Sequence, residues 1–358
     1  MKITRIRTQT IKVPLKRTFK TSLRSVDEIE NIFVFIETDT DMTGFGAAAP
    51  TAVITGETTD SIKGAVNHIN DNLAGLEVVN FEAVMQKLNS CIIGNTSAKA
   101  GVDMALYDLI AKHYKTPLYR FLGGKAQNLE TDTTISIDTI KKMAVDAQKA
   151  VKDGFGILKL KVGNDPGLDI KRLAAVSKAV GPDIRLRIDA NQGWKPKQAV
   201  YVMHELEKAN IIIDILEQPV AARDFKGMKY VRDNVAIPVY ADESVFSPED
   251  ALEIIKMDAV DGINIKLMKC GGIYNALKIA AIAESANINC MIGSMMETSI
   301  SVTAAAHLAI AKNIITGYDL DAPLFMKKNP LQGGMEYNAS TISLPELPGL
   351  GIKALNTA

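Results

Sequence analysis

Length, composition and charge exclude several classes of protein before any motif is considered. The chain has 358 residues, 47% of them hydrophobic, so it is long enough to bury a large core and is not expected to be disordered. Its 41 basic and 41 acidic residues cancel, which removes the basic footprint of a nucleic-acid-binding protein and the polybasic signal of a membrane-surface protein. No uncharged apolar run reaches the length of a membrane span. We therefore expect a small-molecule ligand, with no nucleic-acid or membrane partner.

The cysteines and the N-terminal segment predict a cytoplasmic protein. Cys91, Cys270 and Cys290 are scattered and lack the spacing of metal ligands, as is usual in a reducing compartment. The first 15 residues mix basic and apolar side chains and contain no hydrophobic stretch followed by a small-residue cleavage site. We expect no disulfides and no secretion signal.

The first third of the chain predicts an α+β capping domain over residues 1–125. Alternating apolar residues predict two strands, and a period near 3.6 predicts three helices after them. Near Gly123-Gly124, the pattern changes from strands followed by helices to short strands that alternate with helices. The expected strands cover residues 2–15 and 31–38, and the expected helices cover 57–73, 81–90 and 97–114.

Residues 126–323 predict a modified TIM barrel of the (β/α)7β type. Short apolar strands alternate there with amphipathic helices, with eight strands and seven helices between them. The tail, residues 324–358, is rich in Pro and Gly, and we expect it to leave the barrel and pack on the capping domain. The expected strands are 133–137, 157–162, 185–189, 212–217, 239–242, 263–266, 290–293 and 315–318.

Three successive barrel strands end in a carboxylate, Asp189, Glu217 or Asp242. The carboxyl ends of barrel strands form the active-site face, so these acids are expected to converge. Each acid alone could cap a helix, but three in succession indicate a bound cation. Oxygen ligands without Cys or His favour Mg²⁺, and we expect one ion per subunit. Asn191, two residues after the first acid, is expected to support the site.

Lysines end the strands on either side of these acids. Strand alternation places Lys159 and Lys161 on one face of the second strand, and Lys266 ends the sixth strand on the opposite side of the barrel. A lone Lys-x-Lys is more often a solvated face of an edge strand, but a closed barrel has no edge. Two bases that flank a metal can take a proton from one face of a carbon and return one to the other, while the cation stabilises the enediolate.

A lysine acts as a base only when it is neutral. Its pKa therefore has to fall from about 10.4 toward the operating pH, which burial, the metal and a neighbouring cation such as Lys159 would favour.

In order, the chain contains Lys-x-Lys, Asp-x-Asn, Glu-Gln-Pro, Asp-Glu-Ser and Lys-x-x-x-x-Gly-Gly. This set resembles the muconate-lactonising branch of the enolase superfamily over essentially the whole chain. All four histidines fall in expected helices, so the His base of the mandelate-racemase branch is absent. The resemblance implies an α+β capping domain on a (β/α)7β barrel, Mg²⁺ on Asp189, Glu217 and Asp242, acid–base roles for Lys161 and Lys266, and binding of the substrate carboxylate by Lys159.

The last strand ends in Asp319-Leu320-Asp321, which resembles the signature of dipeptide epimerases in the same branch. Such a pair is also a common turn sequence before Pro, but at the barrel mouth two carboxylates that the metal does not need form a receptor for an ammonium group. Residues 18–25 resemble the loop that covers the site. In that loop, Arg24 is expected either to bind a side-chain carboxylate or to be a plain surface residue. Thr134, Ser294 and Glu297 resemble further lining positions.

We therefore expect a dipeptide epimerase that inverts the second residue of L-Ala-L-Glu and similar Xaa-Glu dipeptides, as in relatives that act on cell-wall peptides, and that forms a homo-oligomer. The alternatives are o-succinylbenzoate synthesis, N-acylamino-acid racemisation or muconate cycloisomerisation on the same lysines and metal, or a ligand-binding barrel without turnover. Asp319 and Asp321 count against the rival reactions, because those substrates lack a free ammonium group.

Overall fold

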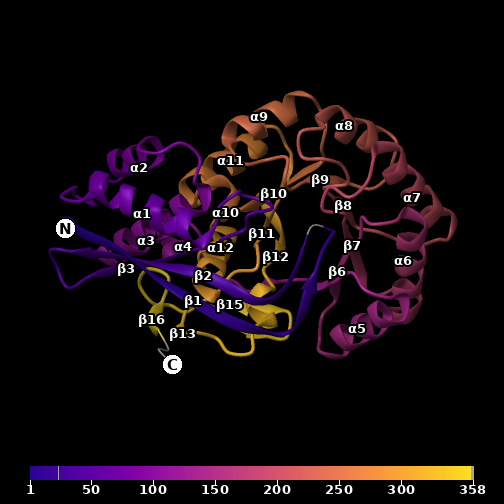
Figure 1. Cartoon of the computed structure of the whole chain (residues 1–358), viewed down its shortest axis with the longest axis horizontal. Helices are drawn as coiled ribbons and strands as arrows, with labels where there is room; N and C mark the ends of the chain where they lie inside the picture. The colour runs from indigo at the N-terminus through magenta and orange to yellow at the C-terminus, as the bar shows by residue number, and fades with distance from the viewer. Residues whose placement is uncertain (23, 356–358) are drawn as a thin grey trace.

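The structure, a computed structural model, describes residues 1–22 and 24–355 and contains an α+β part beside a barrel (Figure 1). Leu23 of the expected covering loop and residues 356–358 of the tail lie outside this range. The α+β part has a three-stranded antiparallel sheet in the order β1-β2-β3. Its elements are β1 (Ile3–Lys20), β2 (Ser25–Thr38), β3 (Thr43–Ala48), α1 (Thr59–Leu73), α2 (Phe81–Ser90), α3 (Thr96–His113) and α4 (Leu118–Phe121).

The first hairpin is longer than the sequence predicts. The strands expected over residues 2–15 and 31–38 continue, and β1 pairs with β2 as far as Lys20 opposite Ser25. Both strands run from the sheet toward the barrel (Figure 1). Residues 18–22 and 24–25 of the expected covering loop therefore lie at the end of a β-hairpin that reaches the barrel mouth.

The barrel prediction is confirmed. Eight parallel strands follow one another in the order β12-β11-β10-β9-β8-β7-β6-β5, and a long helix lies between each consecutive pair. The strands are β5 (Thr133–Ile135), β6 (Ile157–Lys161), β7 (Arg185–Asp189), β8 (Ile215–Glu217), β9 (Val239–Ala241), β10 (Gly262–Lys266), β11 (Asn289–Gly293) and β12 (Ile315–Asp319). The helices are α5 (Ile140–Lys152), α6 (Pro166–Val180), α7 (Pro196–Lys208), α8 (Phe225–Asp233), α9 (Pro248–Lys256), α11 (Ile273–Ser285) and α12 (Ser299–Ala311), with a short α10 (Leu267–Cys270) after β10.

The seam between β12 and β5 is closed differently from the other strand pairs. Within the described ranges, the eight-stranded ladder has these two strands at its ends. Single hydrogen bonds join the segments beside them: the Asp132 N–H donates to the Tyr318 carbonyl at 3.3 Å, and the Leu320 N–H donates to Thr131 Oγ1 at 2.9 Å. These bonds therefore take the place of ladder pairing between β12 and β5 in the described residues.

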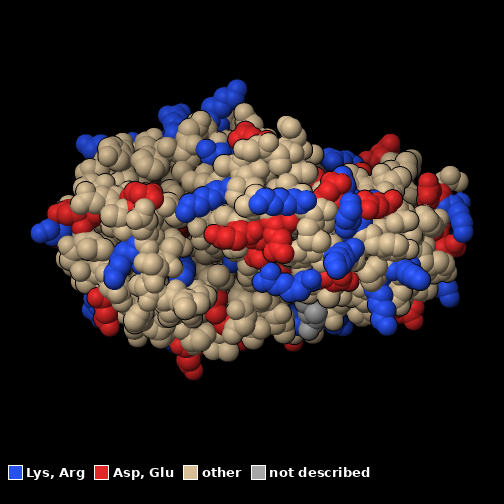
Figure 2. Space-filling model, turned by 90° about the horizontal axis from the view of Figure 1, so that it is seen from above, with Lys and Arg blue, Asp and Glu red and all other residues tan. Residues whose placement is uncertain are grey.

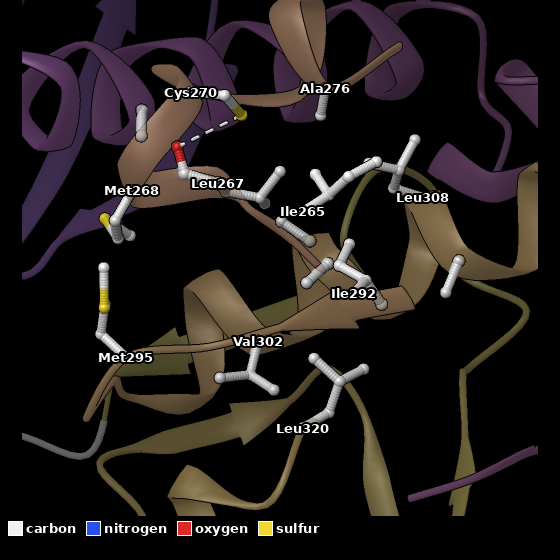
Figure 3. Close-up of a cluster of buried hydrophobic side chains, with 14 of the residues drawn as sticks. Ile265, Leu267, Met268, Cys270, Ala276, Ile292, Met295, Val302, Leu308 and Leu320 are labelled. Atoms are coloured by element: carbon white, nitrogen blue, oxygen red, sulfur yellow. Dashed lines mark hydrogen bonds between the residues drawn. The ribbon is translucent and has the colours of Figure 1, made fainter. Parts of the chain in front are cut away.

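Two helices are buried on all sides because they lie inside the molecule. Every residue from Ser97 to Ala111 of α3 is buried, as is every residue from Ser299 to Ile310 of α12. Figure 3 shows Ile265, Ile292 and Leu308, from β10, β11 and α12, in one apolar cluster. This packing fixes the strands from behind, so the polar residues at their ends are held in place.

The tail touches both parts of the molecule. The Leu350 N–H donates to Asp108 Oδ1 of the α+β part at 2.8 Å, and the Met335 N–H donates to Thr303 Oγ1 of the barrel helix α12 at 3.1 Å. The boundaries predicted for the two domains, 1–125 with 324–358 and 126–323, stay a prediction. The tail contains a 3-10 turn (Ala322–Phe325) and the strands β13 (Leu331–Gly333), β14 (Glu336–Asn338), β15 (Thr341–Ser343) and β16 (Ile352–Leu355); β15 pairs with β4 (Leu129–Glu130).

The surface carries mixed charge. On the face drawn in Figure 2, a group of acidic side chains near the centre is bordered by basic side chains, and charges of both signs are spread over the rest of the face. Within residues 1–22 and 24–355, no helix combines the length and apolar character that crossing a bilayer requires.

The sheet of the α+β part packs so closely on α3 that a methyl group at Gly46 would lie 1.9 Å from the Gly101 carbonyl oxygen. We expect Gly46→Ala to lower the free energy of unfolding by about 1–3 kcal/mol, because backbone must move to admit it. Gly64, in α1, has no atom within 4 Å of such a methyl group. Gly64→Ala is expected to be neutral or to stabilise by about 0.5–1 kcal/mol. Urea unfolding followed by circular dichroism measures both, and equal effects would contradict the packing argument.

Candidate active site

Three carboxylates meet at the carboxyl ends of neighbouring strands. Asp189 and Glu217 end β7 and β8 in register, and Asp242 follows β9 directly. All three side chains are buried, and their carboxylate oxygens lie within 4.8 Å of one another. Buried carboxylates repel unless a cation compensates them, and an all-oxygen donor set suits a hard divalent cation. The residues present therefore fit Mg²⁺.

Two lysines reach these carboxylates from opposite flanks. The Nζ atom of Lys161, on β6, lies 2.5 Å from Asp189 Oδ2, and that of Lys266, on β10, lies 2.7 Å from Asp242 Oδ2. Both side chains line one cavity at the barrel mouth. Burial lowers the pKa of Lys266, but the Asp242 carboxylate outweighs it, so the pKa lies above its ordinary value. To act as a base, Lys266 needs a lowered pKa. A cation held by the same carboxylates would lower it.

Lys159 connects two groups of acids. Its ammonium group is fully buried and lies 2.9 Å from Glu217, 2.7 Å from Asp319 and 3.1 Å from Asp189. Burial lowers its pKa, but these carboxylates hold it well above its ordinary value. The side chain does not line the cavity. Direct contact between Lys159 and a substrate carboxylate therefore stays a prediction.

Asp319 and Asp321 lie at the end of β12 and both line the cavity. Asp319 contacts Lys159, and Asp321 Oδ2 accepts a hydrogen bond from the Thr134 N–H at 2.6 Å. Burial and the neighbouring Asp319 raise the pKa of Asp321 to about 7. The structure thus brings together the two acids and Thr134, as the sequence predicts, in a place where a cationic ligand would be stabilised.

The tip of the first hairpin covers this cavity. Arg24 lines it together with Phe19 and Thr21. Arg24 is partly buried, and this burial lowers its pKa. A partly desolvated guanidinium group favours an anionic group of a ligand.

Of the remaining predicted residues, Ser294 and Asn191 line the cavity and Glu297 does not. Asn191 donates its N–H to Asp189 Oδ1 at 2.8 Å, so it supports a carboxylate of the triad. Glu297 is buried and accepts the Met295 N–H at 2.7 Å, which shapes the loop after β11.

Sequence reasoning missed several residues of the site. Glu243 lines the cavity, and burial together with Asp242 raises its pKa to about 8. Its place directly after Asp242 in Asp-Glu-Ser was the available signal. The apolar lining residues, which no motif marks, are Phe19, Val53, Ile54, Met295 and Met296.

Two family models match the chain. The model described as "Mandelate racemase / muconate lactonizing enzyme, N-terminal domain" matches residues 4–123. The model described as "Enolase C-terminal domain-like" matches residues 142–357. Together they cover nearly the whole chain.

Relatives with known names agree with these matches. The L-Ala-D/L-Glu epimerase of Clostridium acetobutylicum is 52% identical over 347 residues, 97% of either chain. A substrate-liganded structure of the L-Ala-D/L-Glu epimerase from Bacillus subtilis has a TM-score of 0.98 at 47% identity and covers 99% of both chains. A dipeptide epimerase from Enterococcus faecalis, complexed with Mg and L-Leu-L-Tyr, has a TM-score of 0.96 at 43% identity and covers 99% of this chain and 100% of that one. The chain belongs to the mandelate racemase/muconate lactonizing enzyme family of the enolase superfamily.

Proposed function

We propose that the protein is a Mg²⁺-dependent dipeptide epimerase that inverts the α-carbon of the second residue of Xaa-Glu dipeptides such as L-Ala-L-Glu. The observation that carries this proposal is that Lys161 and Lys266 line one cavity from opposite flanks of a carboxylate triad, and that Asp319 and Asp321 line the same cavity. The names of the relatives support it. The expectations of a homo-oligomer and of a cytoplasmic location stay predictions.

Asp189, Glu217 and Asp242 would hold the metal ion. When bound, Mg²⁺ stabilises the negative charge that develops on the substrate carboxylate as the α-proton leaves. Lys161 and Lys266 move the proton: the Nζ atom of one lysine, neutral, takes it from one face of the α-carbon, and the protonated Nζ atom of the other donates one to the opposite face. The two lysines exchange roles in the reverse reaction.

The two ends of the dipeptide would bind to groups of opposite charge. Asp319 and Asp321 accept hydrogen bonds from the N-terminal ammonium group, and Arg24 binds the carboxylate of the second side chain. This arrangement places the second α-carbon between the lysines. An N-acyl substrate would leave the Asp319–Asp321 pair without a counter-ion, which disfavours N-acylamino-acid racemisation.

The first prediction concerns the two lysines. In D₂O with Mg²⁺ and L-Ala-L-Glu, proton NMR is expected to show loss of the Glu α-proton signal and growth of the second diastereomer. Lys161→Met and Lys266→Met should each slow epimerisation by about 10²- to 10⁴-fold, because each removes one proton-transfer group. Each variant should still exchange the α-proton of the one diastereomer that faces its remaining lysine.

The matched control is Lys99→Met. Lys99 is a buried lysine outside the cavity, with its Nζ atom on the Asn89 carbonyl at 2.9 Å, so epimerisation should not change. An active Lys161→Met variant would contradict the two-lysine mechanism.

A second prediction concerns the carboxylate triad. Glu217→Gln should weaken Mg²⁺ binding, measured by isothermal titration calorimetry, by at least about tenfold, because it removes an anionic ligand. Asp108→Asn is the control: Asp108 is equally buried but pairs with Lys112 in the α+β part, so Mg²⁺ affinity should be unchanged. Equal affinities in the wild type and Glu217→Gln would rule out this ion site.

Arg24 gives a third prediction. Arg24→Met should raise KM for L-Ala-L-Glu by about 10- to 100-fold, since a charge-assisted hydrogen bond is lost. KM for L-Ala-L-Met should change by less than about threefold. Lys20→Met, which removes a half-exposed cation from the same hairpin, controls for nonspecific charge effects. The same loss for both dipeptides would show that Arg24 shapes the hairpin and does not select the side chain.

A further inference from the structure

We propose that Asp132 is a third carboxylate of the ammonium receptor, a positioning residue that acts from behind Asp319 and Asp321 and makes a free α-ammonium group the preferred ligand. This inference rests on the proposed function and deepens it. It assigns the preference for a free N-terminus to a residue outside the Asp-x-Asp motif and outside the cavity lining.

The barrel seam brings Asp132 to this position. It precedes β5, and its N–H donates to the carbonyl of Tyr318 on β12 at 3.3 Å. Its side chain is fully buried, and the carboxylate oxygens of Asp132, Asp319 and Asp321 lie within 4.8 Å of one another. Asp132 therefore belongs to a second group of three buried carboxylates, separate from Asp189, Glu217 and Asp242.

The seam also fixes the other two acids relative to Asp132. Thr131, its neighbour, accepts the Leu320 N–H through Oγ1 at 2.9 Å, and Thr134 donates its N–H to Asp321 at 2.6 Å. These bonds come from residues on both sides of Asp132 and hold the Asp-x-Asp segment. A change of charge at Asp132 therefore alters the electrostatic environment of Asp319 and Asp321, whose positions these hydrogen bonds hold.

Within the described residues, Asp132 and Asp319 each contact a cation, whereas Asp321 forms no ion pair. Arg187 pairs with Asp132 at 2.8 Å, and Lys159 pairs with Asp319 at 2.7 Å. Lys159 is shared with Asp189 and Glu217, so it compensates the seam only in part. Asp132 Oδ1 is buried without a hydrogen-bond partner in the described structure. Two cations thus contact the three acids directly, and one of them, Lys159, is shared with the metal triad.

The titration behaviour of the cluster supports this reading. Burial and the Asp319 carboxylate raise the pKa of Asp132, and the same two causes raise that of Asp321. Carboxylates whose pKa is raised by a like charge are relieved when a cation arrives. An ammonium group on the cavity side of Asp319 and Asp321 provides that charge, whereas a methyl or acyl group in its place does not.

The test compares two ligands that differ by the ammonium group alone, L-Ala-L-Glu and propionyl-L-Glu. Binding to the Mg²⁺-loaded enzyme is measured by isothermal titration calorimetry, and turnover by proton NMR. The wild type should bind the dipeptide more tightly than the propionyl analogue. In Asp132→Asn, the affinity for the dipeptide should fall about tenfold and its KM should rise about tenfold. The kcat and the affinity for propionyl-L-Glu should change by less than about threefold.

Two further variants control for the loss of a buried charge and for unfolding. Asp108→Asn removes an equally buried, lysine-paired carboxylate from the α+β part and should leave the ratio of the two affinities unchanged. If circular dichroism shows that Asp132→Asn is unfolded, Asp132→Ser, which leaves room for a water molecule beside Arg187, replaces it and should show the same selective loss.

Unchanged affinity for the dipeptide, or equal losses for both ligands, would overturn the role of Asp132. Failure of the proposed function looks different. A wild type that prefers the ammonium ligand, loses that preference in Asp132→Asn and yet epimerises no dipeptide would refute the function and keep the receptor. A wild type that binds neither ligand refutes both.

Discussion

Mutual repulsion among buried carboxylates is the constraint on which the rest of this structure depends. Burial raises the pKa of Glu217 to about 7, whereas Lys161 and Lys159 hold that of Asp189 at about 2 despite its burial. A cluster of buried carboxylates is stable only where packed strands hold the side chains in position and neighbouring cations compensate their negative charge. The apolar cluster formed by β10, β11 and α12 holds the strands in position. The flanking lysines compensate the negative charge.

Lys159 makes the two acid clusters into one electrostatic unit. Its ammonium group contacts Asp189 and Glu217 on one side and Asp319 on the other, with no exposure to solvent. In this low-dielectric position each contact is stronger than it would be in water, and a change of charge in one cluster alters the compensation of the other. The metal site and the ammonium receptor are therefore expected to bind their cations interdependently.

The chemistry at the strand ends could be predicted from the sequence, whereas the cover of the cavity could be predicted only for residues 18–25 and not for its apolar residues after β3 and β11. A (β/α)7β pattern fixes which strands are neighbours, so a polar residue that ends a strand, such as Lys161 or Asp242, has a known place. Phe19, at the end of β1, and Ile54, after β3, reach the cavity only through the packing of the α+β part on the barrel, which no local pattern encodes. Asp132 precedes its strand, and Glu297 turns away from the cavity because its carboxylate is used by the Met295 N–H.

The residues proposed for the reaction and the residues proposed to select the ligand side chain lie on different elements of the structure. The lysines and carboxylates proposed for the reaction lie on barrel strands or directly after them, and the apolar sides of these strands pack in the core, so small displacements there are costly. Arg24 and Phe19 belong to the end of a hairpin that meets the barrel at its mouth, and Val53 and Ile54 follow β3. A substitution at the hairpin end changes what contacts the ligand side chain without moving Lys161 or Lys266. The receptor at the seam is different, because Lys159 ties it to the metal triad: the requirement for a free ammonium group is therefore built into the same charge network that carries the reaction.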